Sequence, residues 1–273
     1  MLNLHRRPVS RWRMAAGISI LASMPLIGLI GTWLSSYSLR PSPTGGSLPP
    51  SAAHWLGTDD TGRDILRLLL GSIWPAYLAG FLSISIIFAL GSLVGALAGY
   101  YRGLIDRALR LAVNILFVIP ELLQMLFIIA LITPNSMRNA QTWHVILASS
   151  LVGIPGYALL VRNMVSVERD QTYVLAAHSL GLPPWRIALR HIFPNIRPPL
   201  LAFLAGRFKG AILVLSALSF IGLLYDPSVP HLGQLLDDGR RELMFAAWRI
   251  AGPLLVIWLT MLGANLISDA AGE

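Results

Sequence analysis

Long apolar runs alternate with short polar segments along almost the whole chain. A helix of about 20 residues rises some 30 Å, which matches the hydrocarbon thickness of a bilayer. The pattern therefore predicts an all-α integral membrane protein with six transmembrane helices. The predicted spans are residues 14–34, 72–101, 111–132, 142–161, 198–224 and 246–267.

The first run follows a basic segment, a pattern that transmembrane helices share with cleaved signal peptides. Residues 14–34 form 21 positions without a charge, and no convincing small-x-small cleavage site follows them. We therefore expect an uncleaved first span.

The second run contains a glycine stripe, because Gly91, Gly95 and Gly99 recur every four residues. Such a stripe lets a neighbouring helix approach closely. The neighbour can belong to this subunit or to a partner, and the sequence leaves both open.

The third run contains Glu121 directly after Pro120. A charged side chain at the centre of a bilayer costs at least about 2.5 kcal/mol on insertion scales, so we expect Glu121 to face a cavity or a partner. Our hypothesis is that it borders a translocation path. Alternatively, Pro120 loosens the helix, and the Glu121 side chain finds its hydrogen-bond partners close by in the chain.

The connection between the first two spans is predicted to lie outside the membrane, with a helix along the membrane surface. Its apolar positions can face the lipid boundary while its charged positions face water. The apolar set is Ile65, Leu66, Leu68 and Leu69, and the charged set is Asp60, Arg63, Asp64 and Arg67. Asp59, Asp60 and Asp64 suggest a catalytic carboxylate cluster, but no nucleophilic partner accompanies them, so a solvated helix start is favoured.

Composition agrees with a membrane location. The chain is 55% hydrophobic and 12% charged, about half the charged fraction of a soluble domain. It has no cysteine, which excludes disulfides and thiolate metal sites. In a soluble protein its net charge of +8 would suggest nucleic acid, but here loops on the cytoplasmic side can account for it.

Charge placement predicts the orientation. An inner N-terminus puts 14 of the 21 basic residues inside and leaves the outer side near neutral. Residues 1–13 and the tail 269–273 are then cytoplasmic, residues 35–71 are extracytoplasmic, and residues 72–268 form a five-span core that includes loop 166–197. The inner basic residues are Arg6, Arg7, Arg11, Arg13, Arg102, Arg107, Arg110, Arg162, Arg169, Arg186, Arg190, Arg197, Arg207 and Lys209, the last two snorkelling from the fifth span. The outer acids are Asp59, Asp60, Asp64, Asp226, Asp237, Asp238 and Glu242.

Loop 166–197 contains a predicted helical elbow. Gly181 can close a first short helix, and Pro184 can open a second one, which we expect Pro194 to end. Helical spacing puts Trp185, Leu189 and Ile192 on one side of the second helix and its arginines on the other. Taken alone, this pattern also fits a basic loop on the membrane surface.

In its motifs the chain resembles the permease subunits of ABC importers of the dipeptide, oligopeptide and nickel group, over nearly its whole length. Members carry a cytoplasmic loop of the form YVEAARALGxxxxRIxxRHxxPN, and residues 173–195 are YVLAAHSLGLPPWRIALRHIFPN. The string HWLGTDDTGRDIL at 54–66 looks like the outer-loop signature of one permease type, and GYYRGLIDRALR and SALSFIGL look similar to family segments.

The resemblance implies that the elbow docks into a cytoplasmic ATPase. The implied coupling residues are Tyr173, Leu175, Ala176, Ala177, His178, Leu180, Gly181, Arg186 and Arg190. It also implies a contact with an extracytoplasmic solute-binding protein, for which the candidates are Asp59, Asp60, Arg63, Asp64, Asp237 and Asp238.

The same resemblance implies a multi-pass protein of the bacterial inner membrane, surrounded by lipid. Its implied partners are a second homologous permease subunit in a heterodimer, two ATPase subunits and the binding protein, with no nucleic acid. This chain would bind no cofactor, and ATP and Mg would be held by the ATPases. The cargo stays open among peptides, nickel, metal chelates and other solutes.

Three positions depart from the family pattern. Leu175 and Leu215 stand where glutamate is common, which removes two acidic contacts. His178 replaces a common arginine or lysine, and an unperturbed histidine would titrate near a pKa of about 6.5.

Other classes of function find little support in the residues. The single lysine, Lys209, lies outside any GxxxxGK[ST] phosphate loop, and no Gly-x-Ser-x-Gly elbow occurs. The six histidines have no metal-ligand spacing: His5, His54, His144, His178, His191 and His231. The alternatives are an ion-coupled secondary transporter that uses Glu121 and an intramembrane enzyme, which would need a second catalytic group.

Overall fold

In the part of the chain that the structure describes, five helices are long and apolar enough to cross a membrane. The computed structural model describes residues 8–34, 46–133, 140–224 and 229–272. The five are α1 (Pro8–Leu34), α2 (Ile65–Tyr101), α5 (Thr142–Glu168), the stretch Pro184–Phe220 that contains α8 (Phe193–Phe220), and α10 (Trp248–Gly272). The predicted all-α membrane fold is confirmed, with a sixth span if one bent pair is counted. Arg6, Arg7, His5 and Asp226 lie outside the described residues.

The bent pair replaces the predicted third span. α3 (Leu104–Leu116) and α4 (Glu121–Ile132) meet at 100°, so a single continuous helix was the wrong expectation. Pro120 supplies no backbone N–H and cannot continue a helix regularly. Gln124 stabilises the break, because its side-chain nitrogen donates to the carbonyl oxygens of Leu116 at 2.7 Å and Ile119 at 2.8 Å.

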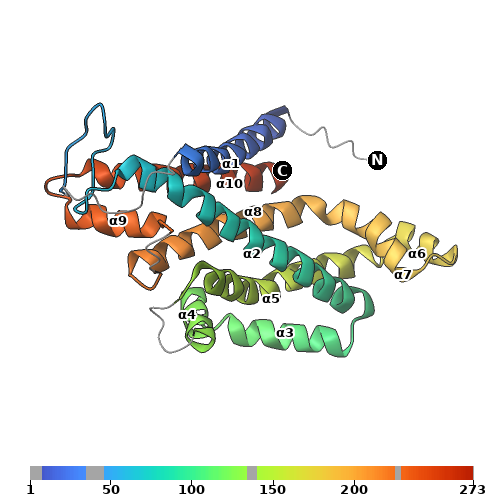
Figure 1. Cartoon of the computed structure of the whole chain (residues 1–273). Helices are drawn as coiled ribbons and strands as arrows, with labels where there is room; N and C mark the ends of the chain where they lie inside the picture. Colours follow the sequence, from blue (N-terminus) through green and yellow to red (C-terminus); the bar gives the residue numbers. More distant parts are fainter. Residues whose placement is uncertain (1–7, 35–45, 134–139, 225–228, 273) are drawn as a thin grey trace.

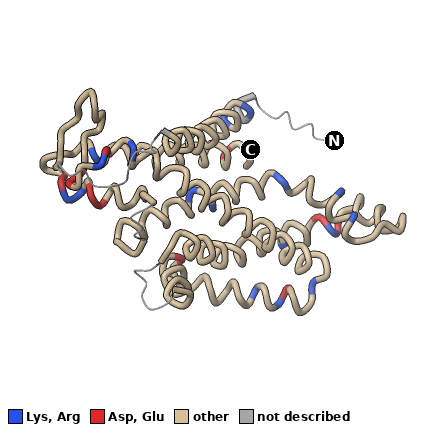
Figure 2. Tube along the Cα trace, in the orientation of Figure 1, with Lys and Arg blue, Asp and Glu red and all other residues tan. Residues whose placement is uncertain are grey.

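The elements gather into two ends (Figure 1). α9 (Leu232–Arg241) and the segment 46–64 lie at one end, which we call the outer end. α6 (Thr172–Ser179) and α7 (Pro184–Ile187) lie at the opposite end, called the elbow end. The antiparallel helices α1 and α10 form one flank of the bundle and α3 the other. Figure 2 shows a dense mixed cluster of acidic and basic residues at the outer end.

Helices α2 and α5 pack through the glycine stripe. A Cβ atom on Gly95 would lie 2.4 Å from the carbonyl oxygen of Ala158, and one on Gly99 would lie 2.6 Å from that of Arg162. Real Cβ atoms do not approach this closely, so only glycine permits the spacing. Of the two partners that the sequence left open, the stripe packs within this subunit.

The expected separate surface helix is absent from the described segment 46–64. Helix α2 begins at Ile65 and runs 37 residues without interruption. Asp64 caps it by accepting from the Arg67 amide at 2.9 Å. Ile65, Leu68 and Leu69 are buried in the protein rather than turned to the lipid boundary, because α9 and α10 cover the first turns of α2.

Pro194 also behaves differently from the prediction, since it lies in the first turn of α8 and ends no helix. A π-helical turn, η2 (Ala188–Ile192), joins α7 to α8, and the Phe193 amide donates to the Ala188 carbonyl. Proline is tolerated in a first turn because its missing N–H is not needed there. The stretch Pro184–Phe220 is thereby helical over 37 residues, about 55 Å of rise.

We expect Gly95→Ala to destabilise the protein, because the added Cβ must push α5 away from α2. Such overpacking costs about 1–3 kcal/mol, measurable as a lower thermal unfolding midpoint in detergent. Gly210→Ala is the matched control, since a Cβ there meets nothing within 4 Å. Equal midpoints for the two variants would contradict the close seam.

Candidate functional site: elbow, outer cluster and buried ion pairs

The elbow has the shape that its glycine and prolines predict. Gly181 adopts φ +75°, a left-handed conformation that glycine takes without strain. Its amide donates to the His178 carbonyl at 2.9 Å, and the Leu182 amide donates to Ala177 at 3.3 Å. α6 therefore ends in a tight turn, and Pro184 opens α7 directly after it.

One face of the elbow packs onto the bundle. Val174, Ala177, Ile187 and Ile192 are buried there, in one apolar cluster with Val165 of α5. The two alanines among the implied coupling residues therefore differ, since Ala177 is buried and Ala176 is exposed. Ile192 likewise lies inside, away from the exposed Trp185 and Leu189 with which the sequence grouped it.

The opposite face of the elbow exposes large apolar side chains. Leu180 is 81% exposed, and Leu175, Trp185 and Leu189 are each more than half exposed. Basic residues lie among them, and the Arg186 guanidinium stands 5.4 Å from the centre of the Trp185 ring. His178, Arg186 and Arg190 are all exposed. This face has no cover within the described chain.

A hydrogen-bonded brace closes the base of the elbow. The Tyr173 hydroxyl donates to Glu168 at the end of α5. The same hydroxyl accepts from the side-chain amide of Asn195, in α8, at 2.9 Å. Burial and the bond to Glu168 raise the pKa of Tyr173. Sequence reasoning identified Tyr173 as a contact residue but missed this internal role.

A second network ties α3 to α5 near the elbow. Asp106 is buried and accepts two hydrogen bonds from Arg162, at 2.6 and 2.7 Å. Arg110 lies 3.1 Å from the same carboxylate. The partners Asp106 and Arg162 are 56 residues apart, so no local pattern could have found them.

Glu121 pairs with Arg207 of α8 through both carboxylate oxygens, at 2.6 and 3.0 Å. The prediction that Arg207 snorkels to the inner end was wrong, because its guanidinium pairs with the Glu121 carboxylate instead. Lys209 is also held within the chain, by Asn265 of α10. The partner of Glu121 is therefore 86 residues away in the sequence rather than local.

At the outer end the six predicted binding-protein contacts divide by role. Asp59 is buried and accepts from Arg63 Nε at 2.7 Å and from the Thr61 and Arg63 amides. Asp64 caps α2 and lies 2.8 Å from His54 Nδ1. These two carboxylates shape the segment and are used internally.

The remaining acids of the set lie on two elements, with Asp60 in segment 46–64 and the half-buried Asp237 and Asp238 in α9. Burial and nearby carboxylates raise the pKa of Asp238, while Arg63 opposes the shift, which places α9 within electrostatic reach of segment 46–64. Burial also acts on Asp237, but its hydrogen bonds to Arg240 and Arg241 prevail and lower its pKa. Asp60 is exposed.

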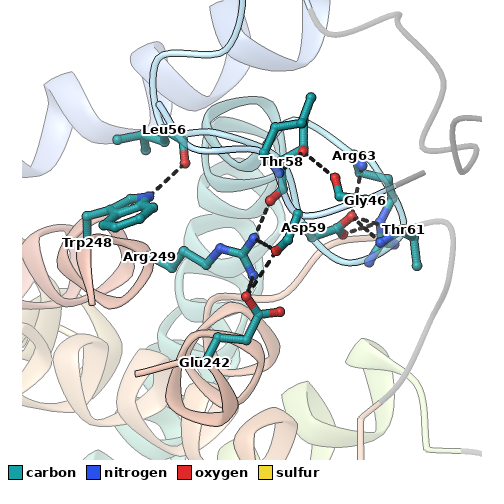
Figure 3. Close-up of polar contacts among 11 residues, drawn as sticks. Gly46, Leu56, Thr58, Asp59, Thr61, Arg63, Glu242, Trp248 and Arg249 are labelled. Atoms are coloured by element: carbon teal, nitrogen blue, oxygen red, sulfur yellow. Dashed lines mark hydrogen bonds and ion pairs between the residues drawn. The ribbon is translucent and has the colours of Figure 1, made fainter. Parts of the chain in front are cut away.

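Arg249 joins the outer segment to α10 (Figure 3). Its side chain is 5% exposed and lies 2.5 Å from Glu242. It also donates to the Thr58 carbonyl and the Ser47 hydroxyl. Next to it, Trp248 donates to the Leu56 carbonyl at 3.3 Å. Ser47 and Thr58 are 202 and 191 residues away from Arg249 in the sequence, so no local pattern could have found these contacts.

The family model described as "Binding-protein-dependent transport system inner membrane component" matches residues 91–273. The glutathione transport system permease protein of Pectobacterium atrosepticum is 35% identical, over 81% of this chain and 71% of that protein. The dipeptide transport system permease protein of Alkalihalophilus pseudofirmus is 32% identical, over 96% and 88%. A probable D,D-dipeptide transport system permease protein of Escherichia coli is 35% identical, over 92% and 82%.

Among solved structures, an inward-facing MetNI methionine ABC transporter matches with a TM-score of 0.56 and 18% identity, over 77% of this chain and 98% of that one. This likeness supports the fold. The chain belongs to the family of inner-membrane permease components, and the resemblance drawn from its motifs is confirmed.

The protein is thus an ABC importer permease, a non-catalytic multi-pass subunit of the bacterial inner membrane. An ABC importer permease works with a partner permease, a binding protein and ATPase subunits that use the ATP.

We expect Arg249→Met to loosen the outer end, because it leaves Glu242 and the Thr58 carbonyl without their cation. Removing one partner of a buried pair costs about 3–5 kcal/mol. The thermal midpoint should fall, and protease cleavage within residues 46–64 should become faster. Arg241→Met is the control. Arg241 also pairs with a carboxylate, that of Asp237, but its side chain is 71% exposed, and such exposed ion pairs contribute at most about 1 kcal/mol. Similar losses in both variants would refute the special role of Arg249.

Proposed function

We propose that this chain forms half of the translocation path of an importer for small peptides of the dipeptide or glutathione type. The relatives named above carry glutathione or dipeptide transport in their names, which favours peptides over nickel or metal chelates as cargo. The full complex would contain a second homologous permease, two ATPase subunits and an extracytoplasmic binding protein.

In the proposed orientation the elbow end faces the cytoplasm, and both chain termini lie on that side. The basic residues of the elbow and of the α2–α3 connection support this orientation. Residues 35–71 and α9 then lie outside. There Asp60, Arg63 and the acids of α9 would contact the binding protein, with Asp59 and Asp64 holding the outer segment in shape.

The observation that carries the coupling proposal is the uncovered apolar face of the elbow, which leads directly into the helical stretch Pro184–Phe220 that crosses the bundle. Leu175, Leu180 and Trp185 expose apolar surface at this end, while the opposite face is anchored to α5 and α8. An ATPase groove that accepts this face would move Pro184–Phe220 as one body. Because Leu175 stands where the family has glutamate, apolar packing replaces an ion pair in this contact.

Leu180→Ser should weaken the ATPase contact without unfolding the subunit, because Leu180 is 81% exposed. Full burial of a leucine is worth about 1.5–3 kcal/mol, so we expect about a tenfold or greater loss in ATPase affinity and lower transport-coupled ATP hydrolysis. Leu104→Ser, at a residue that is 82% exposed, is the matched control. Unchanged affinity in the Leu180 variant, or an equal loss in the control, would argue against the elbow as the docking face.

The cargo is tested with the complete importer, purified by a tag on this subunit and reconstituted in proteoliposomes with its binding protein. We expect ATP-dependent uptake of radiolabelled dialanine or glutathione, and no accumulation of ionic nickel. Uptake of nickel without peptide uptake would overturn the peptide assignment.

A further inference from the structure

The ion pair between Glu121 and Arg207 combines close contact with partial exposure. Both guanidinium NH2 groups contact the carboxylate, at 2.6 and 3.0 Å, so the geometry is bidentate. The pair joins α8 to the start of α4, within the apolar spans. Yet the carboxylate side chain is 48% exposed and the arginine side chain 22%.

The surroundings of the exposed carboxylate are apolar and uncovered. Phe117 is 68% exposed, Val118 81% and Leu123 54%. A charged group at this depth is costly against acyl chains, and such groups face a bundle interior or a water-filled cavity. The exposed side of Glu121 therefore belongs on the path between this subunit and its partner permease rather than on the lipid face.

The proline break does not need Glu121. Gln124 already supplies hydrogen bonds to the Leu116 and Ile119 carbonyls. Irregular backbone at membrane depth is tolerated where protein buries it or where it lines a water-filled cavity. The Glu121 carboxylate is thus not needed for the break, and it stays partly exposed beside Arg207.

The surroundings of Arg207 also leave room for its guanidinium beside Glu121. Gly153 of α5 makes room for it, because a Cβ at Gly153 would stand 3.0 Å from the guanidinium. Among the described residues, Arg207 Nε has no hydrogen-bond partner. Arg207 also lies on the helical stretch that begins in the elbow, so motion of the elbow would move the cation relative to Glu121.

We propose that Glu121 and Arg207 line the translocation path and balance its charge, which favours zwitterionic peptides over peptides with a net charge. This rests on the proposed function. A peptide carries an ammonium and a carboxylate group, which can exchange with the two partners in turn. With either partner neutralised, the path keeps one fixed charge and attracts solutes of the opposite sign.

The test measures initial uptake of alanyl-lysine, dialanine and alanyl-glutamate by the reconstituted importer. The binding protein is loaded with each peptide and added at saturating concentration, so that its own preference among the peptides does not affect the comparison. A fixed charge a few ångströms from a solute in water-like surroundings changes rates by about fivefold. Arg207→Gln should raise uptake of the cationic peptide and lower uptake of the anionic peptide by about this factor each, so the cation-to-anion ratio should rise about 25-fold, and Glu121→Gln should lower the ratio similarly. The double variant Glu121→Gln with Arg207→Gln should return the ratio close to that of the wild type.

Equal losses for all three peptides, or unchanged ratios, would show that the pair is a structural contact and overturn the inference. If the wild-type importer moves no dipeptide, the proposed function itself fails.

An independent measurement uses the absence of cysteine from this chain. Glu121→Cys should react with a membrane-impermeant thiol reagent during turnover, while Leu26→Cys, an exposed position of α1, should not. An unreactive Glu121→Cys would place position 121 outside the path.

Discussion

A polar group at membrane depth must find its partner inside the protein, and this constraint organises the structure. Gln124 bonds the carbonyls that the proline break releases. Arg207 pairs with Glu121, and Lys209 with Asn265. Lipid tails are as apolar as the helix surfaces, so apolar contact alone does not fix the position of one helix against another. Each of these polar contacts joins two elements and fixes their relative position. Polar partners therefore set the register of the bundle.

The helical stretch Pro184–Phe220 links the two ends of the molecule. Its elbow end is held by buried apolar side chains and by the brace through Tyr173. Its outer end is touched by α9, where a Cβ on Gly233 would overlap the Ser216 carbonyl at 1.8 Å. A helix so tightly fixed at both ends can transmit displacement with little bending, which is the property that coupling across a membrane requires.

The two leucines that replace family glutamates have different meanings in the structure. Leu215 is buried in the main core, so a carboxylate there would need a compensating partner, and leucine removes that need. Leu175 is exposed on the elbow face, where it makes the proposed ATPase contact more apolar. The same substitution thus acts on stability at one position and on the proposed interface at the other.

The sequence by itself determined the apolar spans, the glycine stripe, the elbow turn and the family motifs, because each is contained in one continuous stretch of the chain. Local periodicity could not show that Ile65 begins a 37-residue helix packed under α9, that α3 and α4 meet at 100°, or that Pro194 continues a helix after a π-turn. It also could not pair Glu121 with Arg207, Asp106 with Arg162 or Arg249 with Glu242 and Thr58. Those partners lie on different elements, and only the tertiary packing brings the charges within hydrogen-bonding distance.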